Sequence, residues 1–176
     1  MPAQHAVLSA VGPDRPGIVD RISALIHDAG GNIADSRMSI LGDVFALVLL
    51  FSGSPAAVAK VKKSLGPVAK KLDLTWTLRP AGKAAKGRAF LPYRLQVTGL
   101  DHPGIVHQVS AALAGQGVNV ASLDTRLTAA PVSGSPLFVF EADLQVPTDL
   151  AAPDLRRALD RVCAAGALDY TLEMKA

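Results

Sequence analysis

The strongest constraint on the fold is an internal duplication. The stretch "GPDRPGIV" at residues 12–19 returns as "GLDHPGIV" at residues 99–106, at an offset of 87 positions. Over residues 12–34, eleven of twenty-three positions are identical to their counterparts. Chance does not produce such agreement over so short a span, so the chain holds two copies of one structural unit.

Both copies predict the same order of elements. An apolar strand leads into a helix with an apolar stripe, glycines end that helix, and a hairpin, a second helix and an alternating strand follow. The first copy has predicted strands at 5–11, 32–41, 44–51 and 72–78 and helices at 18–26 and 55–65, the second of which ends at Leu65 or continues past Gly66 and Pro67. The second copy has predicted strands at 93–98, 119–128, 137–146 and 168–174 and helices that start at 105 and span 153–164.

This order predicts an α+β protein of two ferredoxin-like βαββαβ domains. We expect the domains at residues 1–80 and 93–176, with a linker at 81–92 that is rich in small and basic residues. Because small domains of this type leave sheet edges and helix faces uncovered, we also expect the chain to form a homodimer.

Composition supports two packed cores in a reducing compartment. Hydrophobic residues make up 49% of the chain and charged residues 19%, which is typical of a folded protein. A single cysteine, Cys163, excludes an intramolecular disulfide and lies on an apolar helix face. No apolar stretch approaches the roughly 18 residues that a membrane span requires. We therefore expect a cytoplasmic protein with no membrane partner.

Positive charge is concentrated in the first half. Residues 1–92 contain 12 basic and 6 acidic residues, for a net charge of +6, whereas residues 93–176 contain 6 and 9, for −3. Such an imbalance is compatible with direct nucleic-acid binding. The alternative is a solvated helix face and a charged linker, which we favour because no aromatic residues interleave with the basic ones. Most of the positive excess comes from Lys60, Lys62, Lys63, Lys70, Lys71, Lys83, Lys86 and Arg88.

The opening of each repeat resembles the ACT domain, a regulatory module that binds small molecules. The resemblance rests on "DRPGIV" and "GGNIADS" in the first repeat and on the looser copy in the second. Two such repeats in one chain are similar to the glycine cleavage system transcriptional repressor family. Similar loops open the regulatory domains of formyltetrahydrofolate deformylase and phosphoserine phosphatase. Those enzymes also contain a catalytic domain, which we do not expect here because the two repeats fill the sequence.

The resemblance implies a protein that binds an amino acid, glycine or serine, and controls a transcription regulator of the glycine cleavage system. A second interpretation is a regulatory module that acts on a metabolic enzyme. Direct nucleic-acid binding and an unrecognised enzyme remain further alternatives. We expect no enzyme activity, because the sequence contains no nucleophile motif, phosphate loop or dinucleotide fingerprint.

The repeated loop has the chemistry to bind an amino-acid zwitterion. If Pro16 and Pro103 occupy the first helical position, the backbone N–H groups that follow them point out of the helix start, where a carboxylate binds well. Asp14 and Asp101 could accept a hydrogen bond from an ammonium group. Alternatively, these aspartates cap the helices and the glycines only allow close packing. If a carboxylate does bind at the helix start, Gly17→Val or Gly104→Val should abolish ligand binding while the fold survives.

Asn32 and Asn119 begin the second strands, about 18 Å of helix away from the loop of their own repeat. In ACT domains that pair side by side, the loop of one domain faces the second-strand start of its neighbour. The resemblance therefore implies that the Asp14 loop acts with Asn119 and the Asp101 loop with Asn32, unless each asparagine only satisfies its own turn. The complete set of candidate ligand-binding residues is Asp14, Arg15, Gly17, Ile18, Asn32, Ile33, Asp101, His102, Gly104, Ile105, Asn119 and Val120.

We expect neither a metal nor a cofactor. The four histidines, His5, His27, His102 and His107, show no metal-ligand spacing. His102 lies in the second loop and could contact a ligand, whereas His107 is expected to face solvent.

Overall fold

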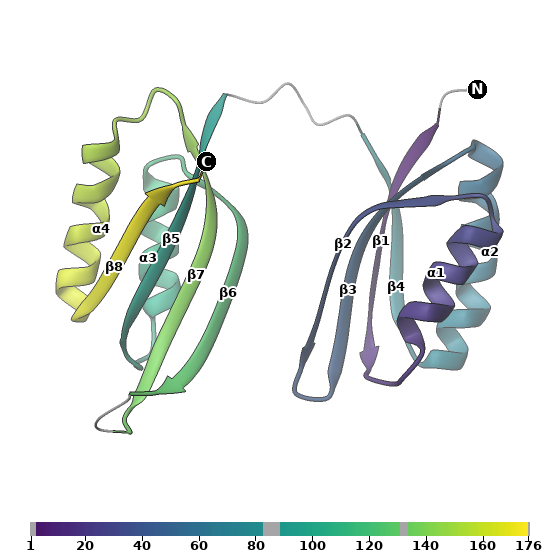
Figure 1. The fold of residues 1–176 in the computed structure, drawn as a ribbon, viewed down its shortest axis with the longest axis horizontal. Helices are drawn as coiled ribbons and strands as arrows, with labels where there is room; N and C mark the ends of the chain where they lie inside the picture. The colour runs from purple at the N-terminus through teal and green to yellow at the C-terminus, as the bar shows by residue number, and fades with distance from the viewer. Residues whose placement is uncertain (1–2, 83–88, 131–133, 176) are drawn as a thin grey trace. The chain divides into compact units, whose positions relative to one another are not determined.

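The computed structural model describes residues 3–82, 89–130 and 134–175. The chain divides into two compact units, Met1–Ala85 and Lys86–Ala176, and each has its own hydrophobic core (Figure 1). We call them the first and the second domain.

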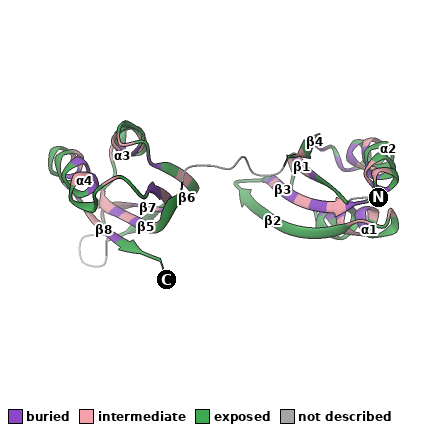
Figure 2. Cartoon of the chain, turned by 90° about the horizontal axis from the view of Figure 1, so that it is seen from above, coloured by how far each residue is buried: buried purple, intermediate pink, exposed green. Residues whose placement is uncertain are grey.

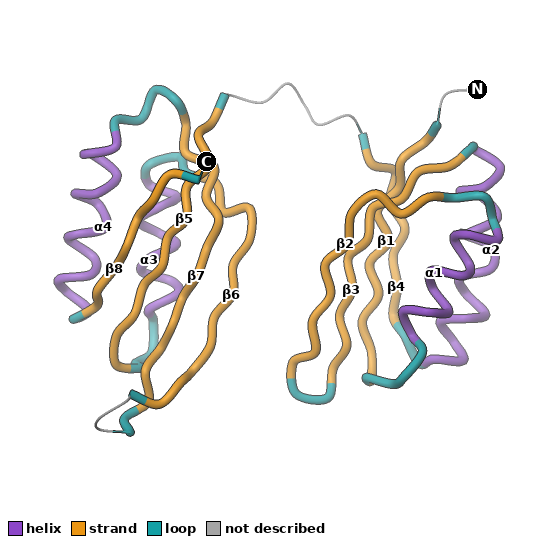
Figure 3. Tube along the Cα trace, viewed as in Figure 1, coloured by secondary structure: helices purple, strands orange, loops and turns teal. Residues whose placement is uncertain are grey.

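Each domain is a four-stranded antiparallel sheet with two helices on one face (Figure 3). The first domain consists of β1 (Gln4–Pro13), α1 (Ile18–Asp28), β2 (Asn32–Leu41), β3 (Val44–Gly53), α2 (Pro55–Leu72) and β4 (Thr75–Ala81), with the strand order β2-β3-β1-β4. The second consists of β5 (Phe90–Leu100), α3 (Ile105–Gly115), β6 (Asn119–Ala129), β7 (Pro136–Pro147), α4 (Ala152–Gly166) and β8 (Leu168–Met174), in the order β6-β7-β5-β8. The predicted pair of ferredoxin-like βαββαβ domains is confirmed.

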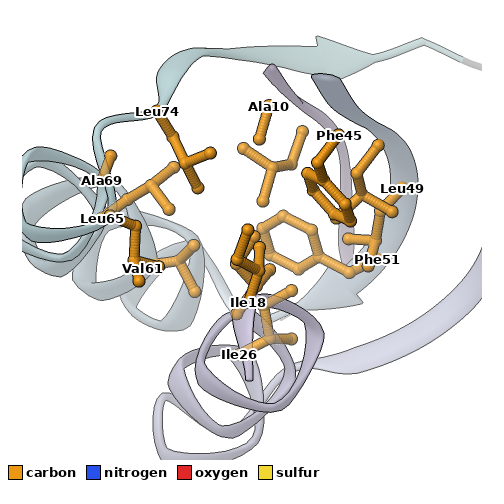
Figure 4. Packing of buried hydrophobic residues seen from close by; sticks show 14 of the residues in the cluster. Ala10, Ile18, Ile26, Phe45, Leu49, Phe51, Val61, Leu65, Ala69 and Leu74 are labelled. Atoms are coloured by element: carbon orange, nitrogen blue, oxygen red, sulfur yellow. The ribbon is translucent and has the colours of Figure 1, made fainter. Parts of the chain in front are cut away.

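The core of each domain lies between its helices and the strands beneath them. In the first domain, β3 contributes Phe45 and Phe51, and α1 contributes Ile18, Ile22 and Ile26 at helical spacing (Figure 4). All five side chains are at most 1% exposed. The alternation along β3 leaves every second side chain on the face of the sheet that the helices do not cover.

Helix α2 continues through Pro67, so the longer of the two predicted helices is correct. The Ser54 hydroxyl accepts a hydrogen bond from the Ala57 N–H at 3.1 Å, and Pro55 occupies the first turn, where its missing N–H costs nothing. A proline in the interior clashes with the Cβ of the residue before it. That residue is Gly66, which has no Cβ, and this allows the helix to run on to Leu72.

One pair of duplicated glycines serves packing. A Cβ at Gly12 would collide with the backbone oxygen of Asp73 and the side chain of Leu74, and a Cβ at Gly99 would lie 2.5 Å from Leu168 Cδ2. Glycine at these positions lets the central strand approach the start of its neighbour, β4 or β8.

The strands on both sides of the predicted linker extend into it. β4 includes Ala81, and β5 begins at Phe90, which pairs with Pro147 of β7. Residues 83–88, with the predicted basic positions Lys83, Lys86 and Arg88, lie outside the described residues. Within the described part of the chain, no helix is both long and apolar enough to cross a membrane.

Candidate functional site

Both first helices begin with a glycine in the left-handed conformation. Gly17 is the N-cap of α1, with φ 87°, and Gly104 is the N-cap of α3, with φ 101°. The prediction that Pro16 and Pro103 occupy the first helical position is therefore wrong, since Ile18 and Ile105 hold that place. Both prolines belong to the loop, because the chain must first turn through a positive φ that only glycine adopts without strain.

This geometry also overturns the expectation that Gly17→Val leaves the fold intact. No atom lies within 4 Å of the position that a Cβ on Gly17 would occupy, so space is available. The obstacle is the backbone, because a β-branched residue at φ 87° is strained. A valine at either N-cap therefore tests stability as well as ligand binding.

The backbone amides at each helix start, those of residues 17–20 and 104–107, lack a partner within the helix. The first helical hydrogen bond of α1 runs from the Arg21 N–H to the Gly17 oxygen at 3.0 Å, and that of α3 from the Gln108 N–H to the Gly104 oxygen at 2.9 Å. The amides before them project from the helix end. No side chain caps either helix. Together with the helix dipole, these amides form a place where a carboxylate can bind.

The two loop aspartates are exposed and do not cap their helices, so the capping alternative is wrong. Their backbones instead tie each loop to the adjoining hairpin. The Asp14 N–H donates to the Asp43 oxygen at 2.9 Å, and the Asp101 N–H donates to the Pro136 oxygen at 3.2 Å. The loop is thus held by its backbone while both carboxylates face solvent, where they can accept hydrogen bonds from an ammonium group.

The isoleucines at the helix starts can contribute only their backbones to a site, because the side chains of Ile18 and Ile105 lie in the cores, 1% and 2% exposed. The next residue of each helix, Val19 or Val106, was not among the candidate site residues. Both valines belong to the apolar stripes of the predicted helices, which were expected to be buried, yet they are 47% and 38% exposed beside the loops. The same residue type at the same position of both repeats was the available signal, but periodicity alone assigned both valines to the core.

The two loops differ in their second residue. Arg15 is exposed. His102 folds back on its own domain, with Nε2 3.2 Å from the Gly166 oxygen and Nδ1 3.2 Å from the Pro103 oxygen. Its ring therefore stabilises the loop, and the first loop has the more accessible side chain for a ligand.

Asn32 and Asn119 lie at the far ends of their helices. α1 has 11 residues and is about 16 Å long, and Figure 1 places the start of β2 at the opposite end of the domain from the loop before α1. Within one domain, the structure therefore does not bring Asp14 and Asn32 together. The Asn119 amide donates to Gln145 Oε1 at 2.8 Å, whereas Asn32 lines a shallow groove of about 390 Å³ with Ile33. Val120, next to Asn119, is half-buried.

Cys163 lies in the core of the second domain and His107 on its surface. Burial raises the pKa of the Cys163 thiol, and nearby Asp160 and Asp169 raise it further, so the thiol is an inert part of the core. His107 faces solvent, as predicted. Among residues 3–82, 89–130 and 134–175, no three His, Cys, Asp or Glu side chains gather as a metal site would require.

Of the basic residues that account for most of the positive charge of the first half, the five described ones lie on α2. Lys60, Lys62, Lys63, Lys70 and Lys71 are all exposed there. Lys60 Nζ donates to the Asp28 oxygen at 2.6 Å and so links α2 to the end of α1. The arrangement is that of a solvated helix face.

Comparison with known proteins gives the family. Residues 4–78 match the ACT domain. The chain is 29% identical to the glycine cleavage system transcriptional repressor of Escherichia coli over 92% of its own length and 85% of the relative's. A crystal structure of an unknown protein from Galdieria sulphuraria is 30% identical and superposes with a TM-score of 0.84, covering 99% of this chain and all of the other.

A second crystal structure, described as that of a candidate glycine cleavage system transcriptional repressor, is 26% identical. It superposes with a TM-score of 0.71 and covers 98% of both chains. The chain is therefore a tandem ACT-domain protein related to the glycine cleavage system transcriptional repressors.

Proposed function

We propose that this chain is a cytoplasmic sensor of a small amino acid, glycine or serine, and that it controls a partner protein according to whether the ligand is bound. The partner is a transcription regulator of the glycine cleavage system. The link to the glycine cleavage system follows the name of the Escherichia coli relative. The amino-acid ligand and the transcription regulator as partner are what the resemblance to that family implies.

One observation carries the ligand class. Each repeat presents a glycine-capped helix start with no side-chain cap, beside an exposed aspartate. The amides at the helix start complement a carboxylate, and the aspartate complements an ammonium group. An α-amino acid carries both groups on adjacent carbon atoms, so one small molecule can satisfy both.

Regulation would work through linkage. A ligand that binds one conformation of the protein more tightly shifts the population toward it, and a partner that prefers another conformation is then released. By thermodynamic reciprocity, the partner must lower the affinity for the amino acid by the same factor. Titrations with the ligand and with the partner must therefore agree.

Isothermal titration with the twenty amino acids tests the proposal. We expect saturable heat with glycine or serine and none with acidic or aromatic amino acids. Asp14→Asn and Asp101→Asn remove one carboxylate each without a change in size, and both should weaken binding because the ammonium group loses its charged acceptor.

Asp28→Asn is the matched control. It makes the same change of charge on an exposed side chain at the opposite end of α1. It should leave the affinity unchanged. Equal binding by all three variants, or no heat with any amino acid, would contradict the proposal.

A further inference from the structure

Each sheet has one face that its helices cover and one that no described element of its own domain covers (Figures 1 and 2). We call the second of these the open face. It is formed by the side chains that alternate with the buried ones along each strand.

The open face of the first sheet is apolar at its centre and polar at its edges. The central strands β1 and β3 present Val7, Val11, Val44, Ala46, Val48 and Leu50 there, together with Ser9, whose hydroxyl is hydrogen-bonded to that of Thr77 at 2.7 Å. The outer strands β2 and β4 present Asp35, Arg37, Ser39, Thr75, Thr77 and Arg79, and β2 adds the exposed Leu41 at its end. An apolar centre inside a polar rim is the usual composition of a protein–protein interface.

The second domain has charged residues at the same positions of the same framework. Val7 lies opposite Leu50 in the first sheet, whereas Arg94 lies opposite Asp143 in the second. Val48 corresponds in register to Glu141, which pairs with Arg126 at 2.9 Å. Since the second domain has the same fold with charges at these places, folding does not require apolar residues there.

We propose that the open face of the first sheet binds the same face of a second copy of this chain across a two-fold axis. The four strands present about 600 Å² of sheet, so two copies would bury about 1,200 Å², within the range of stable interfaces. A two-fold contact also requires a surface that complements itself.

The charges on this face meet that requirement. Arg37 forms an ion pair with Asp35 at 2.5 Å, so both signs stand side by side on the rim. The apolar centre of one copy can pack against the apolar centre of another. Because the rim carries both signs of charge, the face does not favour a strongly acidic or a strongly basic partner. The open face of the second domain carries ion pairs near its centre, such as Lys175 with Asp143, and its exposed apolar residues, Leu100 among them, lie toward one end of the strands.

Sedimentation of a charged variant tests the interface. Val48 is 52% exposed, so Val48→Glu places a charge in the proposed interface at little cost to the folded domain. At about 20 µM the natural chain should be dimeric and Val48→Glu monomeric, because an unpaired buried charge opposes association. The matched control is Met38→Glu, since Met38 is 50% exposed on β2 but lies on the helix side of the same sheet, opposite Leu47. It should remain dimeric.

The double variant Val7→Arg with Leu50→Asp is a second test that is expected to fold. The second domain has Arg94 opposite Asp143 at the same register, so this pair of charges is compatible with the sheet. It should also give a folded monomer, with circular dichroism as the check. A monomeric natural chain would overturn the proposal. A dimer that persists in both open-face variants, or that Met38→Glu also dissociates, would place the contact elsewhere.

Discussion

At the scale of single residues, the N-cap glycines explain why the repeated loop keeps its sequence. The positive φ of Gly104 is a backbone requirement, because a Cβ there would meet only the end of the Gln108 side chain, at 3.4 Å. The helix start thereby stays free of side-chain atoms that would cover its amides. One residue thus serves both the turn into the helix and access to the candidate ligand site.

Gly104→Ala should destabilise the second domain by about 1–2 kcal/mol, because alanine pays the steric cost of the left-handed region. Gly115→Ala on the same helix is the control. No atom lies within 4 Å of the position that a Cβ on Gly115 would occupy, and the φ of Gly115 is not positive. Alanine there should therefore raise stability by about 0.5–1 kcal/mol, because it is the better helix former. Urea unfolding followed by circular dichroism measures both changes. Equal effects of the two substitutions would show that backbone conformation does not decide the choice of glycine.

Sequence patterns could not separate the two roles of glycine. Gly12 and Gly17 are equally repeated, yet one admits a neighbouring backbone and the other provides a positive φ. Pro16, next to Gly17, suggested a helix start two residues too early, because the fixed φ of proline suits either a first helical turn or a loop. Such choices depend on contacts and torsions that a single sequence does not state.

At the scale of elements, α2 contains a built-in weak point. Pro67 cannot donate a hydrogen bond to the carbonyl one turn earlier, so Pro67→Ala should stabilise the first domain by about 1–3 kcal/mol. Trp76 packs beside this turn, 4.0 Å from the Cβ position of Gly66, and its fluorescence reports the unfolding. Pro55→Ala is the control and should change little, since Pro55 lies in the first turn. A gain from both changes, or from neither, would contradict this explanation.

The open face of the second sheet predicts a pH dependence. The hydrogen bond from Arg126 holds the pKa of Glu141 below its usual value, and the one from Lys175 does the same for Asp143. Because the folded state favours the ionised forms, their contribution to stability is complete above the unfolded pKa values and is lost as the pH falls through the lowered folded ones. Stability from these pairs should therefore decline below about pH 4.5.

Arg126→Ala should raise the pKa of Glu141 toward its usual value, and a carboxyl titration by NMR measures the change. Lys175→Ala is the companion variant, since Lys175 pairs with Asp143 and should leave Glu141 largely unaffected. A Glu141 pKa that is the same with and without Arg126 would contradict the assignment.

At the scale of the whole molecule, the duplication predicted the architecture correctly because it doubled every signal. Apolar periodicity that is ambiguous once becomes decisive when it recurs 87 residues later in the same order. The duplication alone would also suggest that the two domains have similar surfaces, which is wrong for their open faces. The cores of the repeats match, but their open faces differ, with Val48 in one and Glu141 in the other. Selection on a shared fold preserves buried positions and leaves exposed ones free to diverge.

The candidate site was only partly predictable for a related reason. The sequence identified the loop aspartates and the backbone of the helix start, because Asp, Pro and Gly have strong local preferences. It did not predict that Val19 is exposed or that His102 bends toward Gly166, since both depend on the packing of distant segments.

A titration of the ¹⁵N-labelled chain, followed by its amide NMR signals, tests amino-acid binding at the helix starts most directly. With glycine or serine, the account predicts saturable shifts at the amides of residues 17–20, 104–107 or both, because those N–H groups would donate to the ligand carboxylate. Asp14→Asn should diminish the shifts at 17–20 and leave those at 104–107 in place. Shifts confined to other parts of the chain, or none at saturating amino acid, would contradict the account.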